Sequence, residues 1–159
     1  MNDIFTENYT FVNYNNISDE DIIKILQIRN SYEVRRWMVN DTEIPLESHL
    51  KFVASLKAND TKDYFIIKDN SGKIIGSVNI DYLDTGTAER GIFINPEFQK
   101  RGHAYNSMKE LYEILAQSGI KKIITKVKAD NQPSNALELK LGAVHTHTSG
   151  NYNHYILSI

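Results

Sequence analysis

One loop in the middle of the chain contains residue types suited to holding a phosphate group. The segment Gln99–Ala104 (QKRGHA) follows a predicted strand and leads directly into a predicted helix. Its glycine and alanine let the backbone approach a ligand closely, and the free N–H groups of a helix's first turn favour an anion. Lys100 and Arg101 add positive charge. The loop is neither a P-loop nor a dinucleotide-binding loop, since GxxxxGK[ST] and GxGxxG are both absent. Because short loops that contain glycine are common, the alternative is a helix start that merely uses a glycine.

Two further blocks accompany this loop at a regular distance. Upstream, the strand predicted over residues 87–94 contains Glu89 near its start, and downstream the segment Asn131–Ala143 reads NQPSNALELKLGA. In this order the Q-x-x-G-x-A loop and the N-x-x-S and K-L-G block resemble the GCN5-related N-acetyltransferases. The resemblance extends over nearly the whole chain. It implies one domain over residues 1–159, with an α/β (α+β) fold whose central strands splay apart.

The resemblance implies acetyl-CoA as cofactor and assigns residues to each part of it. Backbone groups of the strand would pair with the pantetheine arm, the loop would bind the pyrophosphate, and polar residues of the second block would contact the arm. Asn131 has an alternative role as a helix cap, because it lies just before Pro133. The implied cofactor residues are Ile92, Phe93, Ile94, Gln99, Lys100, Arg101, Gly102, His103, Ala104, Asn131, Ser134 and Asn135.

Direct transfer from acetyl-CoA to an amine needs a proton acceptor, and the resemblance makes Glu89 the candidate. Its alternative role is a surface carboxylate paired with Lys or Arg. The chain departs from the family pattern at Glu138, where many members have a tyrosine as proton donor to the departing thiolate. A carboxylic acid of ordinary pKa, about 4, is mostly ionised and donates poorly. Three donors therefore stay open: Glu138 kept protonated, Tyr105, or water.

The first third of the chain is expected to build the acceptor site. Arg29-Asn30, then Trp37, then a helix carrying His49 look like the nucleotide-sugar N-acetyltransferases of pseudaminic acid synthesis. That likeness implies a small-molecule acceptor, the 4-amino group of a UDP-linked 4-amino-4,6-dideoxy-N-acetyl sugar, contacted by these four residues. The alternative for Trp37 is a core position, and for His49 it is packing or capping within its helix.

Other functions remain open on sequence alone. A ribosomal-protein N-terminal acetyltransferase or a small-amine acetyltransferase would use the same cofactor. A protein that binds acetyl-CoA without turnover is a third alternative, because of Glu138. The histidines at 145, 147 and 154 could meet on a hairpin, but no carboxylate pattern accompanies them, so we expect no metal site.

Composition narrows the class of protein. The 159 residues contain no cysteine and carry a formal net charge of −2, which excludes thiolate chemistry and disfavours nucleic-acid binding. No signal peptide or apolar run long enough for a membrane span is present, so we expect a cytoplasmic monomer or homodimer.

Periodicity predicts about seven strands in a mixed sheet and four helices. The strands are expected at 9–14, 64–68, 74–83, 87–94, 122–128, 144–148 and 152–159, and the helices at 19–30, from 45, 102–117 and 133–141.

Overall fold

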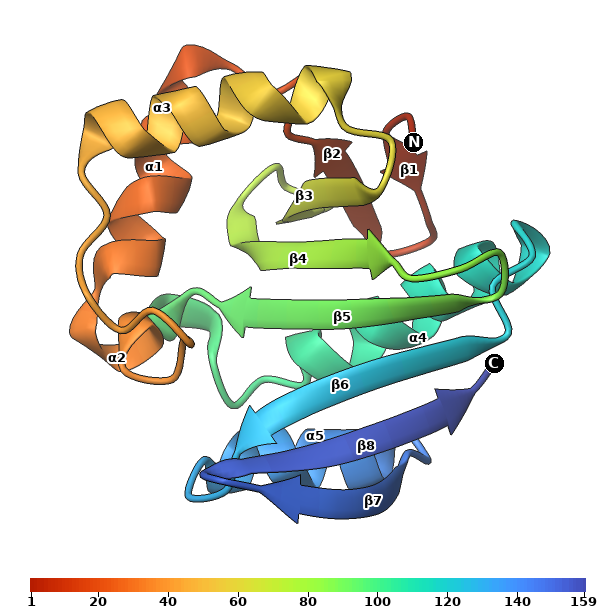
Figure 1. Ribbon diagram of the computed structural model, residues 1–159. Coiled ribbons are helices and arrows are strands. Elements are labelled where there is room, and N and C mark those ends of the chain that lie inside the picture. Colours follow the sequence, from red (N-terminus) through yellow and green to blue (C-terminus); the bar gives the residue numbers. More distant parts are fainter.

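The computed structural model describes residues 1–159 and contains one mixed sheet of eight strands in the order β1-β2-β3-β4-β5-β6-β8-β7 (Figure 1). Only β5 and β6 run parallel, and every other neighbouring pair is antiparallel. The strands are β1 Ile4–Phe5, β2 Tyr9–Asn13, β3 Lys62–Asp69, β4 Ile74–Tyr82, β5 Thr87–Ile94, β6 Lys122–Lys128, β7 Val144–Ser149 and β8 Tyr152–Ser158. The α-helices are α1 Asp19–Asn30, α2 Tyr32–Arg35, α3 Leu46–Ser55, α4 His103–Gln117 and α5 Gln132–Lys140.

Helices cover both faces of the sheet, as Figure 1 shows. On one face α4 packs on the middle strands, and its Met108 and Leu111 join Phe65, Val78 and Ile80 in the larger core cluster. On the opposite face α1 and α3 bury a smaller cluster that includes Tyr14, Ile25, Val53 and Ile66. Because successive strand residues alternate between faces, β3 supplies Phe65 and Ile67 to the larger cluster and Ile66 to the smaller one.

The sequence predicted most of these elements, with two omissions. The strand and helix bounds agree with the prediction to within two residues, and Ser18 accepts a hydrogen bond from the Asp21 N–H (3.2 Å), as its capping spacing predicts. The predicted totals of seven strands and four helices were wrong by one each. The missing elements are β1, with two residues, and α2, with four. Neither is long enough to show a periodic pattern.

The sheet opens in its middle. Only Thr87–Glu89 of β5 pair with Lys122–Ile124 of β6, and beyond them the two strands diverge toward the left of Figure 1. On its other side β6 stays fully paired with β8. The predicted splay of the central strands is confirmed. None of the helices is both long and apolar enough to span a bilayer.

Candidate active site

The open edge of β5 exposes the backbone of alternate residues. The Leu83 N–H donates to the Thr87 carbonyl (3.0 Å), and the Asn95 N–H donates to the Ile75 carbonyl (2.7 Å). In a regular antiparallel ladder every second residue directs its N–H and carbonyl toward the partner strand. Counted from these two bonds, Phe93 is one of the residues of β5 that bond to β4. Ile92 and Ile94 turn their N–H and carbonyl groups toward the opening.

This alternation along β5 corrects the prediction that the backbone groups of Ile92, Phe93 and Ile94 all face the cofactor arm. The backbone of Phe93 is occupied by β4, and its side chain packs with the smaller core cluster. The carbonyl of Ile94 accepts a hydrogen bond from Gln99 Nε2 (3.1 Å). The groups left open on β5 are therefore the N–H and carbonyl of Ile92 and the N–H of Ile94.

The loop before α4 has the backbone geometry of an anion site. Gly102 has φ 81° and caps α4, while Lys100 is the one non-glycine residue with positive φ, 62°. The Asn106 N–H makes the first intrahelical bond, to the Gly102 carbonyl (3.0 Å), so the N–H groups before it have no partner in the helix. Arg101 is exposed and lies over the Phe98 ring at 5.6 Å. Free N–H groups, a helix N-terminus and two cations fit a pyrophosphate.

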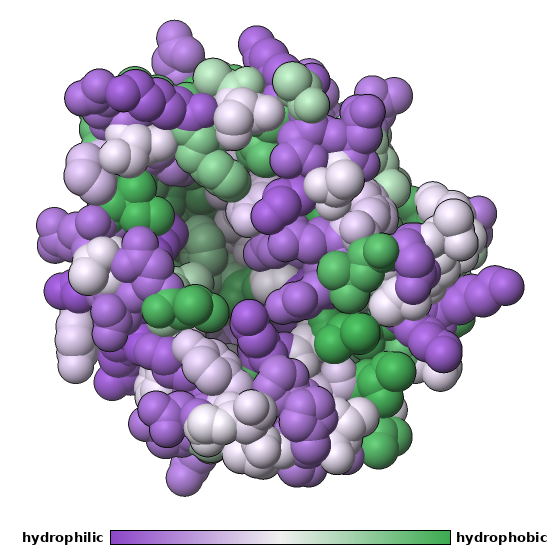
Figure 2. Space-filling view, viewed as in Figure 1, coloured by the Kyte–Doolittle hydropathy of each residue, from purple (hydrophilic) through white to green (hydrophobic).

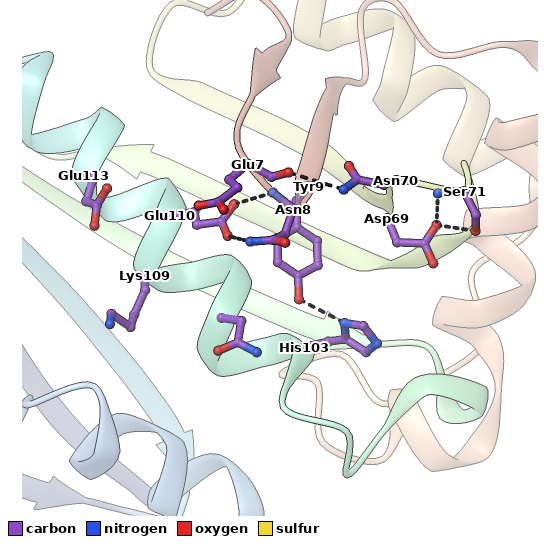
Figure 3. A pocket seen from close by; sticks show the side chains of 11 residues that line it. Glu7, Asn8, Tyr9, Asp69, Asn70, Ser71, His103, Lys109, Glu110 and Glu113 are labelled. Atoms are coloured by element: carbon purple, nitrogen blue, oxygen red, sulfur yellow. Dashed lines mark hydrogen bonds between the residues drawn. The ribbon is translucent and has the colours of Figure 1, made fainter.

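His103, the first residue of α4, is held by the N-terminal part of the chain. Its Nδ1 lies 2.9 Å from the Tyr9 hydroxyl, and Figure 3 shows the two side chains pointing toward one another. They border a cavity of about 640 Å³ whose lining includes Glu7, Glu110 and Glu113. Because these carboxylates repel anions, the cavity is unsuited to phosphate. The Tyr9–His103 contact instead joins β2 to the start of α4.

The second block is mainly occupied in building the turn from β6 to α5. Asn131 caps α5 by accepting from the Ser134 N–H (3.4 Å), which is the alternative role considered for it, but its amide N–H groups remain free. Asn135 donates to the carbonyls of Lys128 (3.0 Å) and Asn131 (2.8 Å) and accepts from the Tyr155 hydroxyl (2.6 Å). The side-chain amide of Asn135 therefore uses its hydrogen-bonding groups within the chain, contrary to the prediction that it contacts the cofactor. Ser134 is half-buried, and its hydroxyl makes no hydrogen bond within the chain.

Glu89 lies in a row of charges across the face that carries α1–α3. The row runs over four strands: Lys62 is 3.5 Å from Asp81, Asp81 is directly opposite Glu89, and Lys126 is 3.9 Å from Glu89. The alternative role considered for Glu89, a carboxylate paired with a lysine, is therefore met in part. The pair is long, however, and the Glu89 side chain is 36% exposed, so its carboxylate remains accessible to an amine or to water. Sequence reasoning missed the other three residues, although the alternation of β6 (KIITKVK) indicates a lysine face.

Glu138 is buried in an ion pair on the opposite face. Both of its oxygens accept from Arg90 Nη2, at 2.8 and 2.9 Å, and Arg90 Nε donates to the Tyr112 hydroxyl at 2.8 Å. Burial disfavours the charge on Arg90, but Tyr112 and Glu138 together hold its pKa above the ordinary value. A carboxyl group whose two oxygens both accept from a guanidinium is placed as an ion-pair partner rather than as a proton donor. The prediction of Glu138 as general acid is not supported by this arrangement.

Tyr105, the other candidate donor, lies away from this pair. Its ring sits under the Lys140 ammonium at 4.2 Å, between α4 and α5. Tyr105 precedes Tyr112 by seven residues, which corresponds to about 10 Å along the helix. The structure therefore does not bring Tyr105 to the place where Glu138, Tyr112 and Arg90 meet.

Two of the four predicted acceptor residues are hydrogen-bonded within the chain, and a third, His49, is buried with its Nε2 unpartnered. Arg29 donates to the Thr42 carbonyl (3.0 Å), and the Asn30 amide makes two 2.9 Å bonds to the backbone of Ile44. Both residues hold the irregular segment after α2 against α1. His49 is only 7% exposed, and burial lowers its pKa. Sequence spacing could not distinguish these roles from ligand contacts, because the same polar groups serve either.

Trp37 lies beside Arg36, and two lysines of β6 that the sequence analysis did not single out lie near this pair or on the same face. The Arg36 guanidinium lies 4.6 Å from the Trp37 ring, and the Arg36 carbonyl accepts from Lys128 Nζ (2.8 Å). Lys126 is on the same face of β6, two residues away. We call Arg36, Trp37, Lys126 and Lys128 the cationic platform. On the same face Figure 2 shows a hollow beside the helices α1 and α3, with hydrophobic residues on its floor and a mixture of polar and hydrophobic residues around it.

The three histidines near the C-terminus do not gather as a set of ligands. His147 stacks on His154 across β7 and β8, with ring centroids 4.3 Å apart, while His145 lies beside Thr148 and Tyr155. No group of three possible ligands forms in this region.

Comparisons with known proteins agree with this architecture. The family described as "Acetyltransferase (GNAT) domain" matches residues 12–144. Two curated relatives from Campylobacter jejuni, both named Acetyltransferase PseH, are 26% and 24% identical over 116 residues, which is 72% of this chain and 73% of each relative.

Solved structures show the same fold at lower identity. The C. jejuni N-acetyltransferase PseH in complex with acetyl coenzyme A superimposes with a TM-score of 0.77 at 17% identity, covering 94% of this chain and 98% of that one. The Vibrio cholerae spermidine N-acetyltransferase in complex with CoA and spermine gives 0.79 at 17% identity, covering 94% and 95%.

Proposed function

The chain belongs to the GNAT acetyltransferase family and is an acetyl-CoA-dependent N-acetyltransferase, and on this premise we propose that its acceptor is a UDP-linked 4-amino-4,6-dideoxy-N-acetyl sugar, acetylated on the 4-amino group. The observation that carries the choice of acceptor is the cationic platform, which lies on the same face as Glu89. The likeness to the PseH enzymes supports it.

In this proposal the open edge of β5 and the start of α4 bind the acetyl donor, which supplies an activated thioester. The free N–H groups of the loop and first turn of α4 hold the pyrophosphate, helped by Lys100 and Arg101. The open groups of Ile92 pair with the pantetheine arm, and an N–H on this edge stabilises the oxyanion that forms on the thioester carbonyl. The free amide of Asn131 is a further donor to the arm.

Glu89 is proposed as the proton acceptor for the attacking amine. An ammonium group has no lone pair to attack with, so it must lose a proton first. Glu89 faces the acceptor side and keeps contact with solvent, so it can take that proton directly or through a water molecule. The amine then attacks the thioester carbon without a covalent enzyme intermediate, which a chain with no cysteine does not need.

The platform discriminates between acceptor classes by charge. A UDP-sugar carries a pyrophosphate, which Arg36, Lys126 and Lys128 attract, and a uracil, which can stack on Trp37. A polyamine is cationic and would be repelled by the same groups. Beside the platform, the pair of carboxylates Asp81 and Glu89 favours a cationic acceptor. Lys62 and Lys126 flank that pair and oppose its charge.

The test is acetyl transfer measured as thiol release from acetyl-CoA. We expect turnover with the UDP-4-amino sugar and none with spermidine or peptides bearing free N-termini. In the double variant Arg36→Gln/Lys126→Gln, KM for the sugar should rise about tenfold or more, while KM for acetyl-CoA should not change. The matched control is Lys51→Gln, which removes a 75% exposed lysine on α3. Turnover on peptides or polyamines alone would keep the cofactor assignment and overturn the acceptor.

A further inference from the structure

We propose that Arg90 is a further catalytic residue, which stabilises the coenzyme A thiolate as it leaves and so replaces the proton donor that this chain lacks at position 138. The inference rests on the proposed function, in that it takes the opening between β5 and β6 as the place of acetyl transfer. It adds a leaving-group role to a residue on the opposite face from Glu89.

Arg90 is the first residue of β5 beyond the paired part of the opening. The ladder between β5 and β6 ends at Glu89 and Ile124, so Arg90 and Thr125 follow on the two diverging strands. Both residues are buried, at 5% and 3% exposure, and the Thr125 hydroxyl has no hydrogen-bond partner. A buried guanidinium and an unpartnered hydroxyl thus lie at the narrow end of the opening, on the α4 and α5 face.

The protein uses only part of the Arg90 guanidinium. Nε donates to Tyr112 and Nη2 donates to Glu138, which leaves both hydrogens of Nη1 without an acceptor in the chain. Nη1 is not among the fully buried polar atoms that lack a partner, so this nitrogen keeps a small accessible surface in a side chain that is only 3% exposed. Two partners fix the plane of the group, and the third nitrogen is open. This is a preorganised donor rather than a closed ion pair.

The chemistry balances without an acid at position 138. The amine nitrogen bonds to the thioester carbon, its proton passes to Glu89 or to water, and the C–S bond breaks with its electron pair moving to sulfur. The sulfur leaves as a thiolate beside Nη1 and takes a proton from solvent afterwards. A nearby arginine lowers the pKa of a thiol and so makes the thiolate a better leaving group. Glu138 is then a positioning residue, because it acts by orienting Arg90.

The experiment is a titration of the thiol of coenzyme A bound to the full-length protein, followed by the ultraviolet absorbance of the thiolate. The test variant is Arg90→Gln/Glu138→Gln, which replaces the ion pair by two amides of similar size. Arg90→Lys keeps the positive charge. Affinity for desulfo-coenzyme A, which has no thiol, reports whether the binding site of each variant is intact.

We expect the bound thiol to ionise at a pH at least one unit below that of free coenzyme A in the wild type. In the double variant it should return to the value of free coenzyme A, kcat should fall about 10- to 100-fold, and desulfo-coenzyme A should bind as before. Arg90→Lys should restore part of both effects. An unshifted thiol in the wild type, or the same shift in the double variant, would overturn this inference. Since no acceptor is present, the titration does not depend on the proposed sugar.

Discussion

Glu89 shows how a single side chain acquires a role from its neighbours across the sheet. Asp81 faces it from β4, and Lys126 lies on the β6 side at 3.9 Å. Exposed ion pairs of this length stabilise a protein little, so the pair with Lys126 does not prevent Glu89 from engaging a substrate. The row of alternating charges therefore leaves one accessible carboxylate where an amine can approach.

Replacing Glu89 by glutamine should separate chemistry from binding. Glu89→Gln keeps size and polarity but cannot take a proton, so kcat should fall about 100-fold while acetyl-CoA affinity changes less than twofold. The pH–rate profile should also change in shape, because the variant has no carboxylate at position 89 to accept the proton. Steady-state kinetics over a pH series and calorimetric binding give both quantities. Glu113→Gln, an exposed carboxylate on α4, is the control. An unchanged pH profile would show that Glu89 is not the base.

A substitution at Gly102 tests whether the loop before α4 binds the pyrophosphate, and Gly72 provides a matched control position. Gly102→Glu places a carboxylate in the anion site at φ 81°, so acetyl-CoA binding should be lost. Gly72→Glu has nearly the same φ, 82°, in the turn after β3, with open space around it. Both should lower stability by about 1–2 kcal/mol, the usual cost of a left-handed side-chain residue. Calorimetry should then show that Gly102→Glu has lost acetyl-CoA binding and that Gly72→Glu has kept it. Equal affinities of the two variants would show that the loop before α4 does not bind the pyrophosphate.

At the scale of elements, β5 divides its residues between two partners. Odd-numbered residues such as Gly91 and Phe93 bond to β4, while Ile92 and Ile94 face the opening. The same alternation sends the side chains of Ile92 and Ile94 to the α4 core and that of Phe93 to the other cluster. One strand thus anchors the sheet and presents a binding edge.

Hydrogen exchange can measure directly which N–H groups of β5 are bonded to β4 and which face the opening. In the free protein the N–H groups of Ile92 and Ile94 should exchange faster than those of Gly91 and Phe93, because only the latter two are bonded to β4. Acetyl-CoA should slow Ile92 and Ile94 by tenfold or more and leave the other pair nearly unchanged. NMR-detected exchange with and without ligand provides the measurement. Equal protection of all four residues in the free protein would contradict the alternation assigned to this ladder.

At the scale of the molecule, few contacts join the two halves of the sheet. Strands β1–β5 meet β6–β8 through the short parallel ladder, and the Arg90–Glu138 pair adds a link from β5 to α5. Breaking a buried ion pair at one end leaves an uncompensated charge, which typically costs about 3–5 kcal/mol. A neutral replacement of both partners costs much less.

The free energy of unfolding should reflect this coupling. Glu138→Gln should lose about 3–5 kcal/mol, and Arg90→Gln/Glu138→Gln should recover most of that loss. Urea unfolding of the two variants, with Arg90→Gln to complete the cycle, measures the coupling energy. Glu20→Gln, which removes the exposed pair with Lys24, is the control and should leave stability unchanged. Additive losses from the two single substitutions would show that the residues do not act as a pair.

The sequence by itself determined the features that are encoded locally. Alternation over 87–94 and 122–128, the capping of the helix at Ser18 and the QKRGHA loop before α4 depend on neighbouring residues, so the main elements, the family and the cofactor could be predicted. Two short elements were missed because a pair of residues or a single helical turn has no period. The loop could be found because all its chemistry is contiguous in the chain.

Only the tertiary structure decided how polar groups are used. Strand register turned the backbone of Phe93 toward β4, and helix packing buried Glu138 against Arg90, which lies 48 residues away in sequence. The segment after α2 occupied Arg29 and Asn30, and strand order brought Lys126 to Glu89. A residue's type and spacing state which bonds it can make. Which partner it finds depends on contacts between distant segments, and no local pattern contains them.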